Sequence, residues 1–103
     1  MRSLDKKTLL LNATSQAPGA DFNVERDRGF TFVITTTSQG AATVDIEAWI
    51  GGAWHVINSE SVSAQGSIMI RDDMGHYEKI RAKVSSRVDG TYSVFATGTV
   101  DSL

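Results

Sequence analysis

The sequence predicts an all-β protein, an antiparallel β-sandwich or jelly roll of about eight short strands. From Phe30 onward, apolar and polar residues alternate with a period of two, and turn-forming residues interrupt the alternation at regular intervals. The 103 residues are 41% hydrophobic and 21% charged with a single proline, which is the composition of one globular domain. The pattern gives little support for any helix.

The first twenty residues are expected to form an extended N-terminal arm, and residues 21–103 the sandwich domain. Within the arm, residues 7–13 predict a strand and residues 15–20 a loop held by a Pro-Gly pair. Residues 22–25 predict a short edge strand. The three leucines at 9–11 are too few for a signal peptide or a membrane span, so we expect synthesis and assembly in the cytosol.

The rest of the chain alternates strands with turns. Predicted strands cover residues 30–37, 43–50, 53–58, 61–71 with a break or bulge near Gln65-Gly66, 77–86 and 91–100. A turn is expected at Gln39-Gly40, and Gly51-Gly52 has the composition of a two-residue hairpin loop. Asp89-Gly90 predicts a second hairpin, joining the last two strands.

The Gly51-Gly52 loop sets a register that brings two tryptophans together. The expected pairs are Ile50 with Ala53, Trp49 with Trp54, Ala48 with His55, and Ile46 with Ile57. The tryptophans share a face with Asp45 and Glu47, so they are expected on the outer side of the sheet. There they are either covered by the N-terminal segment, or shield the hairpin, or bind a partner protein or a sugar.

The other polar residues do not form a recognisable catalytic or metal-binding pattern. His55 is expected toward the core beside Ala48, as a hydrogen-bonded structural residue. The segment 72–76, DDMGH, reads as a turn, because its carboxylates are not spaced as a calcium loop requires. The alternating Lys79, Arg81 and Lys83 predict the solvent face of one strand, or a contact with an acidic protein surface. We expect no catalytic residue, no metal and no cofactor.

Charge and cysteine content narrow the range of partners. The formal net charge is −2, from 10 basic and 12 acidic residues, and no Lys or Arg lies between Gly29 and Ile70. We therefore expect neither nucleic acid nor a membrane as a partner. The chain has no cysteine, so it cannot contain a disulfide or a thiolate metal site.

Two segments resemble small β-sandwich virion proteins of tailed bacteriophages. Residues 43–57 read TVDIEAWIGGAWHVI, and YEKIRAKVSS at 77–86 is followed by GTYSV at 90–94. The match departs from the family at Ile50, where Asp is common. The resemblance implies a capsid decoration, head-fibre, neck or tail subunit, commonly a trimer that attaches to the shell by an extended arm. Trp54 and Arg81 match the motif and are expected to be structural within it.

We therefore expect a non-enzymatic virion protein, assembled in the host cytoplasm. Its most specific form is a capsid decoration subunit that binds the major capsid protein or another virion protein and forms a homo-oligomer, with a trimer favoured. The expected contact residues are Arg2, Lys6, Lys7, Leu9, Trp49 and Trp54. One alternative is a carbohydrate- or receptor-binding module of a phage fibre or tail, with Trp49, Trp54, Tyr77 and Tyr92 as stacking platforms. Another is a small enzyme with His76 and Asp72 in one pocket.

Overall fold

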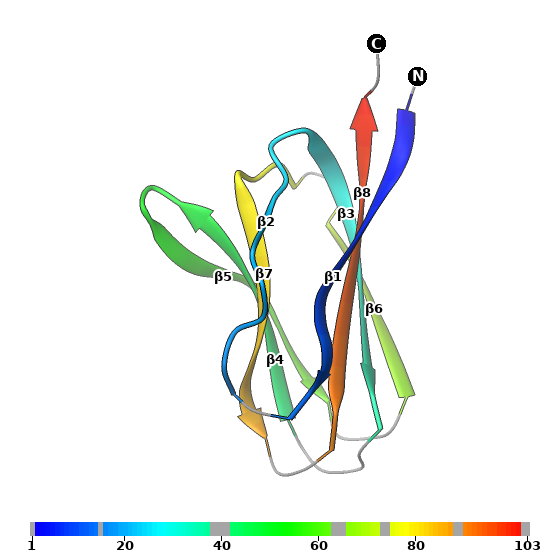
Figure 1. Ribbon diagram of the computed structural model, residues 1–103, viewed down its shortest axis with the longest axis vertical. Coiled ribbons are helices and arrows are strands. Elements are labelled where there is room, and N and C mark those ends of the chain that lie inside the picture. Colours follow the sequence, from blue (N-terminus) through cyan, green and yellow to red (C-terminus); the bar gives the residue numbers. More distant parts are fainter. Residues whose placement is uncertain are drawn as a thin grey trace.

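The computed structural model contains eight strands in two antiparallel sheets that pack face to face (Figure 1). It describes residues 2–14, 16–37, 42–62, 66–72, 75–87 and 90–101. The first sheet has the order β1-β8-β3-β6 and the second the order β2-β7-β4-β5. The strands are β1 (Arg2–Ala13), β2 (Phe22–Asn23), β3 (Asp27–Thr36), β4 (Ala42–Ile50), β5 (Ala53–Val62), β6 (Gly66–Asp72), β7 (Lys79–Arg87) and β8 (Tyr92–Asp101). The prediction of an all-β antiparallel sandwich is confirmed.

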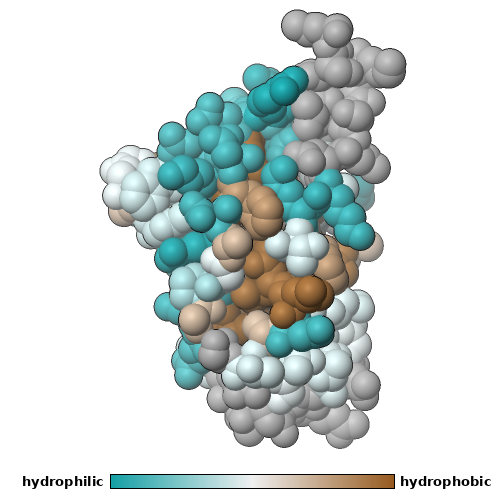
Figure 2. All heavy atoms as spheres, in the orientation of Figure 1, coloured by the Kyte–Doolittle hydropathy of each residue, from teal (hydrophilic) through white to brown (hydrophobic). Residues whose placement is uncertain are grey.

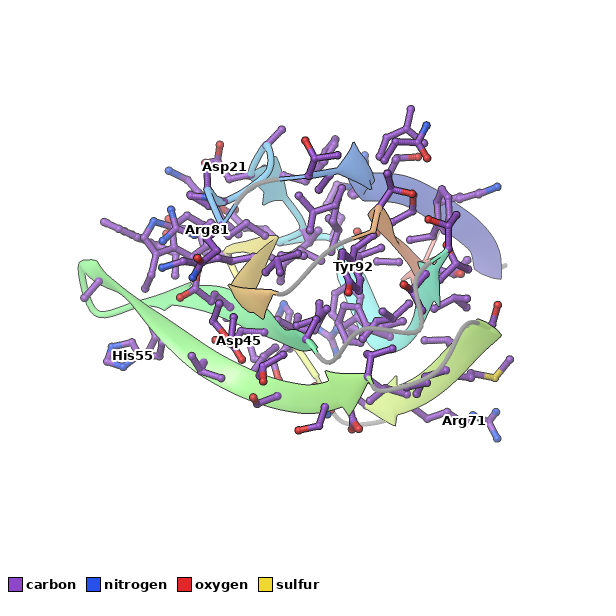
Figure 3. The ribbon with its side chains drawn as sticks, turned by 90° about the horizontal axis from the view of Figure 1, so that it is seen from below. Asp21, Asp45, His55, Arg71, Arg81 and Tyr92 are labelled. Carbon is purple, nitrogen blue, oxygen red and sulfur yellow. The ribbon has the colours of Figure 1, made fainter. Side chains whose placement is uncertain are left out.

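The core lies between the two sheets and follows from the period-two pattern. On β4, alternate residues from Ala42 to Ala48 are buried while the residues between them are partly exposed. The buried side chains of β3, Phe30, Phe32 and Ile34, come from the opposite sheet. Tyr92 is fully buried in this core (Figure 3). Alternation along each strand therefore separates an inner apolar face from an outer polar one.

Most connections run from one sheet to the other. Only β4 and β5 are neighbours both in sequence and within a sheet. The hairpin expected at Asp89-Gly90 is therefore wrong, because β7 and β8 belong to different sheets; Asp89 itself lies outside the described residues. Gly90 does have a positive φ of 87°, the property that produced the turn signal, but a tight bend does not specify which sheet the next strand joins.

The predicted strand at 61–71 is divided between the sheets as well. Its first two residues end β5, and from Gly66 onward it forms β6 in the other sheet. The expected break near Gln65-Gly66 thus falls between β5 and β6. Residues 63–65 themselves, and residues 38–41 at the expected Gln39-Gly40 turn, lie outside the described residues.

The N-terminal residues form an edge strand, where the sequence suggested an arm. β1 pairs antiparallel with β8 from the Arg2–Asp101 pair to the Ala13–Tyr92 pair, with two register shifts between Thr8 and Ala13. Leu9 is 1% exposed and belongs to the core. Residues 2–13 are thus part of the sandwich, because Leu9 and Leu10, which follow the charged N-terminus, pack inward.

The β4–β5 hairpin extends away from the rest of the sandwich (Figure 1). Gly51 and Gly52 both have positive φ, 62° and 84°, as a two-residue hairpin loop requires. The register next to the loop is as predicted for the Ile50–Ala53, Trp49–Trp54 and Ala48–His55 pairs. The Ile46–Ile57 pair is wrong: a β-bulge between Ile46 and Glu47 places Asn58 opposite Ile46 and leaves Ile57 as the extra residue of β5.

Candidate protein-binding surfaces

The two tryptophans form a cross-strand pair on the outer face of the second sheet. Trp49 and Trp54 are opposite each other, with ring centroids 5.4 Å apart and an interplanar angle of 69°, an edge-to-face arrangement. Both are partly exposed, while the neighbouring Ala48 is fully buried. The sequence therefore predicted both the contact and the outward direction, which follow from the loop length and the alternation.

Cations from β7 cover these rings. The Lys79 ammonium lies 5.5 Å from the Trp49 ring centroid, and the Arg81 guanidinium carbon lies 4.2 Å from that of Trp54. Arg81 Nε also donates a 2.7 Å hydrogen bond to Glu47 Oε1 on β4, the strand between β5 and β7. The three strands are thus joined by a cation–aromatic ladder, which we define as Trp49, Trp54, Lys79, Arg81 and Glu47.

On the same outer face, the residues next to the ladder also contact one another across the strands. Asp45 is the register partner of Lys83, and Ser59 Oγ donates a 2.7 Å hydrogen bond to Asp45 Oδ1. Arg81 lies on the outer side of β7, away from Tyr92 in the interior (Figure 3). The tryptophans are therefore covered in part by the chain itself, through the side chains of β7.

The four aromatic residues suggested as a sugar platform do not form one surface. Tyr92 has no exposed area. Tyr77 stacks on Phe30, with ring centroids 5.8 Å apart, and its hydroxyl donates a 2.6 Å hydrogen bond to Asp72 Oδ2. Burial, together with this hydrogen bond and the negative charge of Asp72, raises the pKa of Tyr77 from 10.0 to about 12. Only the tryptophans remain on the outer face.

The histidines occupy separate places. His55 is exposed, so its expected place in the core is wrong: it pairs with Ala48 near the end of the projecting hairpin, where no opposite sheet covers it (Figure 3). His76 Nε2 lies 3.0 Å from the Glu25 carbonyl oxygen, whereas the Asp72 carboxylate accepts a hydrogen bond from Tyr77. The two side chains suggested for an enzyme pocket therefore have different hydrogen-bond partners. Among the described residues there is no group of three or more His, Cys, Asp or Glu side chains that could hold a metal ion.

The predicted contact residues of the N-terminal segment have different surroundings. Leu9 is buried, so it cannot contact a partner. The side chain of Lys7 is 16% exposed, and its Nζ lies 3.9 Å from Oδ2 of the buried Asp27. Lys6 is exposed, with its Nζ 5.5 Å from the Phe95 ring centroid. Arg2 is in β1, but its side chain lies outside the described part.

Several exposed apolar residues were not predicted as contacts. Leu11 on β1 and Met69 on β6 are each 67% exposed, and Ile50 and Val56 on the hairpin are 48% and 53% exposed. Figure 2 shows an apolar surface over β1 and the neighbouring β2. The run of three leucines was the signal for Leu11: Leu9 and Leu10 are both buried, and the register shifts between Thr8 and Ala13 break the alternation, so that Leu11 is left exposed. None of the described residues forms a helix with the length and hydrophobicity needed to cross a bilayer.

Comparison with known proteins identifies the fold. No protein family and no curated protein matches the sequence. Among solved structures, SPBc2 prophage-derived protein YomS is similar with a TM-score of 0.68 and 16% identity, over 96% of this chain and 95% of that one. PBSX exported protein XepA gives a TM-score of 0.74 and 18% identity over 95% of this chain, which spans only 38% of XepA.

A third similar structure comes from Bacillus endospore appendages, which are described as disulfide-linked pili. It has a TM-score of 0.54 and 12% identity, over 100% of this chain and 86% of that chain. At these identities the likeness shows a shared sandwich fold. The present chain contains no cysteine, so it cannot form such disulfide links.

Proposed function

We propose that this protein is a structural subunit of a bacteriophage virion, and within that class a capsid decoration subunit that binds the major capsid protein. The main support is the similarity to YomS, a prophage-derived protein, over nearly the full length of both chains. XepA adds a second phage-derived protein that contains a domain of this shape. In this proposal the protein acts by contact and has no catalytic role.

The proposed contact surface is the apolar surface around β1. Leu11 is 67% exposed, and Phe22 on β2 packs against the core while remaining partly exposed. Exposed leucine and partly exposed aromatic side chains are typical of the centre of a protein interface. The exposed Lys6 on the same strand would then lie at the polar rim.

The test is binding to capsids that lack this protein. Purified protein is mixed with such capsids, and co-sedimentation and the temperature of shell disruption are measured. We expect binding and a more heat-resistant shell. Leu11→Asp should reduce binding at least about tenfold, because it places a charge in a desolvated contact. Met69→Asp, at an equally exposed leucine-sized residue on the opposite edge of the same sheet, is the matched control.

The possible outcomes test the virion role and the proposed contact surface separately. If the unaltered protein binds no capsid, neck or tail, the virion role is wrong. If it binds and Leu11→Asp binds equally well, the virion role stands and the β1 surface is wrong.

A further inference from the structure

The second sheet ends in a strand with a free edge. In the part of the chain that the structure describes, β5 has a strand partner on one side only, β4. β5 is ten residues long, and part of it lies in the projecting hairpin, clear of the sandwich (Figure 1). An isolated hairpin has marginal stability in water, but the cation–aromatic ladder ties this one to β7. The edge is therefore held in a defined position.

The other sheet edges carry features that hinder pairing. β1 contains Lys6 and Lys7 and two register shifts. The free side of β7 is covered by the chain before β2: Gly19 N donates a 2.9 Å hydrogen bond to the Ala82 carbonyl oxygen, and Pro18 forms a bridge with Lys83. β6 is shorter, seven residues, and contains Arg71. Lysine, proline, bulges and covering loops are how sheets avoid edge-to-edge association.

β5 has few of these features. Its sequence, AWHVINSESV, has no Lys, Arg or Pro, and its single irregularity is the bulge at Ile57. We propose that β5 pairs antiparallel with β5 of a second copy of this chain, about a two-fold axis between Ile57 and Asn58. The two four-stranded sheets would then join into one sheet of eight strands, and the assembly would be a dimer and not the expected trimer.

The bulge makes this register possible. A two-fold axis perpendicular to a sheet pairs residues that share a face, so in a regular strand paired positions must differ by an even number. The bulge shifts the alternation by one. His55 and Glu60 both lie on the inner face, opposite Ala48 and Val44, while Val56 and Ser59 both lie on the outer face, opposite Glu47 and Asp45.

The two halves of β5 are therefore complementary to each other. The bulge separates residues 53–56 from residues 59–62, two blocks of equal length that the axis exchanges. The two-residue loop makes Ile50–Ala53 a hydrogen-bonded pair, so the peptide groups of 54, 56, 59 and 61 point toward the free edge. The proposed register pairs 54 with 61 and 56 with 59, which satisfies these groups.

The side chains fit the same register. His55 would lie opposite Glu60 of the second copy, so the only acidic side chain of the strand meets its only imidazole, and this contact occurs twice. No two like charges face each other. The exposed Val56 would pack beside Ser59 of the second copy and lose part of its 53% exposure.

The experiment is a charge exchange measured by sedimentation equilibrium over a concentration series. The unaltered chain should form a dimer. His55→Glu places two acidic side chains opposite each other at both contacts and should raise the dissociation constant at least about tenfold. The double variant His55→Glu/Glu60→Lys should return it to within about threefold of the starting value. Ser67→Glu on β6, another exposed residue of an edge strand changed to an acid, is the matched control and should have no effect.

A second variant tests the backbone pairing. Val56→Pro removes an amide that points to the free edge and should also favour the monomer; circular dichroism and thermal unfolding verify that it folds. A monomer at every concentration, a trimer, or a dimer that His55→Glu leaves intact overturns the proposal. A double variant that stays monomeric overturns the register. None of these outcomes depends on whether the protein binds a capsid.

Discussion

The substitution Gly19→Ala tests whether the N-terminal strand is part of the folded core. A Cβ atom at residue 19 would overlap the carbonyl oxygen of Leu9 and lie 2.6 Å from Leu10 Cδ2 and 3.2 Å from the Leu9 carbonyl carbon. Leu9 is buried and its strand is paired with β8, so the carbonyl cannot move aside without disturbing β1. The Leu10 side chain could rotate, but the backbone contact would remain.

The expected loss of stability is about 2–3 kcal/mol, which combines overpacking with strain on the hydrogen bond from Gly19 N to the Ala82 carbonyl oxygen. For a domain of this size, that loss lowers the unfolding midpoint by about 10–20 °C. Thermal unfolding followed by circular dichroism measures it. The exposed neighbour offers a matched control, Ala20→Ser, which should change the midpoint little.

A detached N-terminal arm would respond differently to this substitution. If residues 2–13 formed a detached arm, the new methyl group would meet nothing. Gly19→Ala would then be neutral, or slightly stabilising through the lower entropy of the unfolded chain. An unchanged or raised midpoint would therefore contradict the packing of β1 against the 16–20 segment.

Three further predictions concern side-chain contacts. Trp54→Ala removes an aromatic partner and the ring under a guanidinium, so we expect a loss of about 2 kcal/mol in urea unfolding; a loss below about 0.5 kcal/mol would contradict the ladder. Lys7→Met removes a cation beside the buried Asp27 and should cost about 1–2 kcal/mol, more than Lys6→Met at the exposed neighbouring position. Tyr77→Phe should remove an alkaline transition: the pKa of Tyr77 is raised from 10.0 to about 12, so its contribution to stability is complete below pH 10 and falls between pH 10 and 12. The free energy of unfolding, measured with urea at several pH values across this range, should decline less steeply in the variant. An identical decline would contradict the raised pKa of Tyr77.

Local patterns predicted the strands and the hairpin well, because their causes are local. Gly51-Gly52 can adopt positive φ at both positions, and this loop alone determines that Trp49 faces Trp54. The bulge at Ile57 could not be predicted in this way. It inserts one residue into an otherwise alternating run, and Val56 and Ile57 are both β-branched residues typical of strands, so the composition does not reveal where the register shifts.

The cation–aromatic ladder shows where prediction from sequence ends. Alternation along each strand predicts that the two tryptophans lie on the outer face of one hairpin and that Lys79 and Arg81 lie on the outer face of another strand. Their contact depends on β7 lying beside β4, with Glu47 opposite Arg81. Strand neighbours separated by more than thirty residues are decided by the packing of the whole domain, which alternation along a single strand does not encode.

The same long-range pairing explains why Leu9 was misjudged. Viewed along the chain, the first residues are charged and irregular, as an arm would be. Their strand partner, β8, is almost ninety residues away, so no nearby residue indicates that β1 completes a sheet.

The central position of β8 has a consequence for how the protein is made. β8 lies between β1 and β3, so it joins the first strand of the chain to the rest of its sheet. During synthesis, β1 emerges before the other seven strands of this domain, and its strand partner β8 is missing until residues 92–101 leave the ribosome. The first sheet can therefore close only after nearly all of these residues have been translated, and the leucines of β1 remain accessible to chaperones until then.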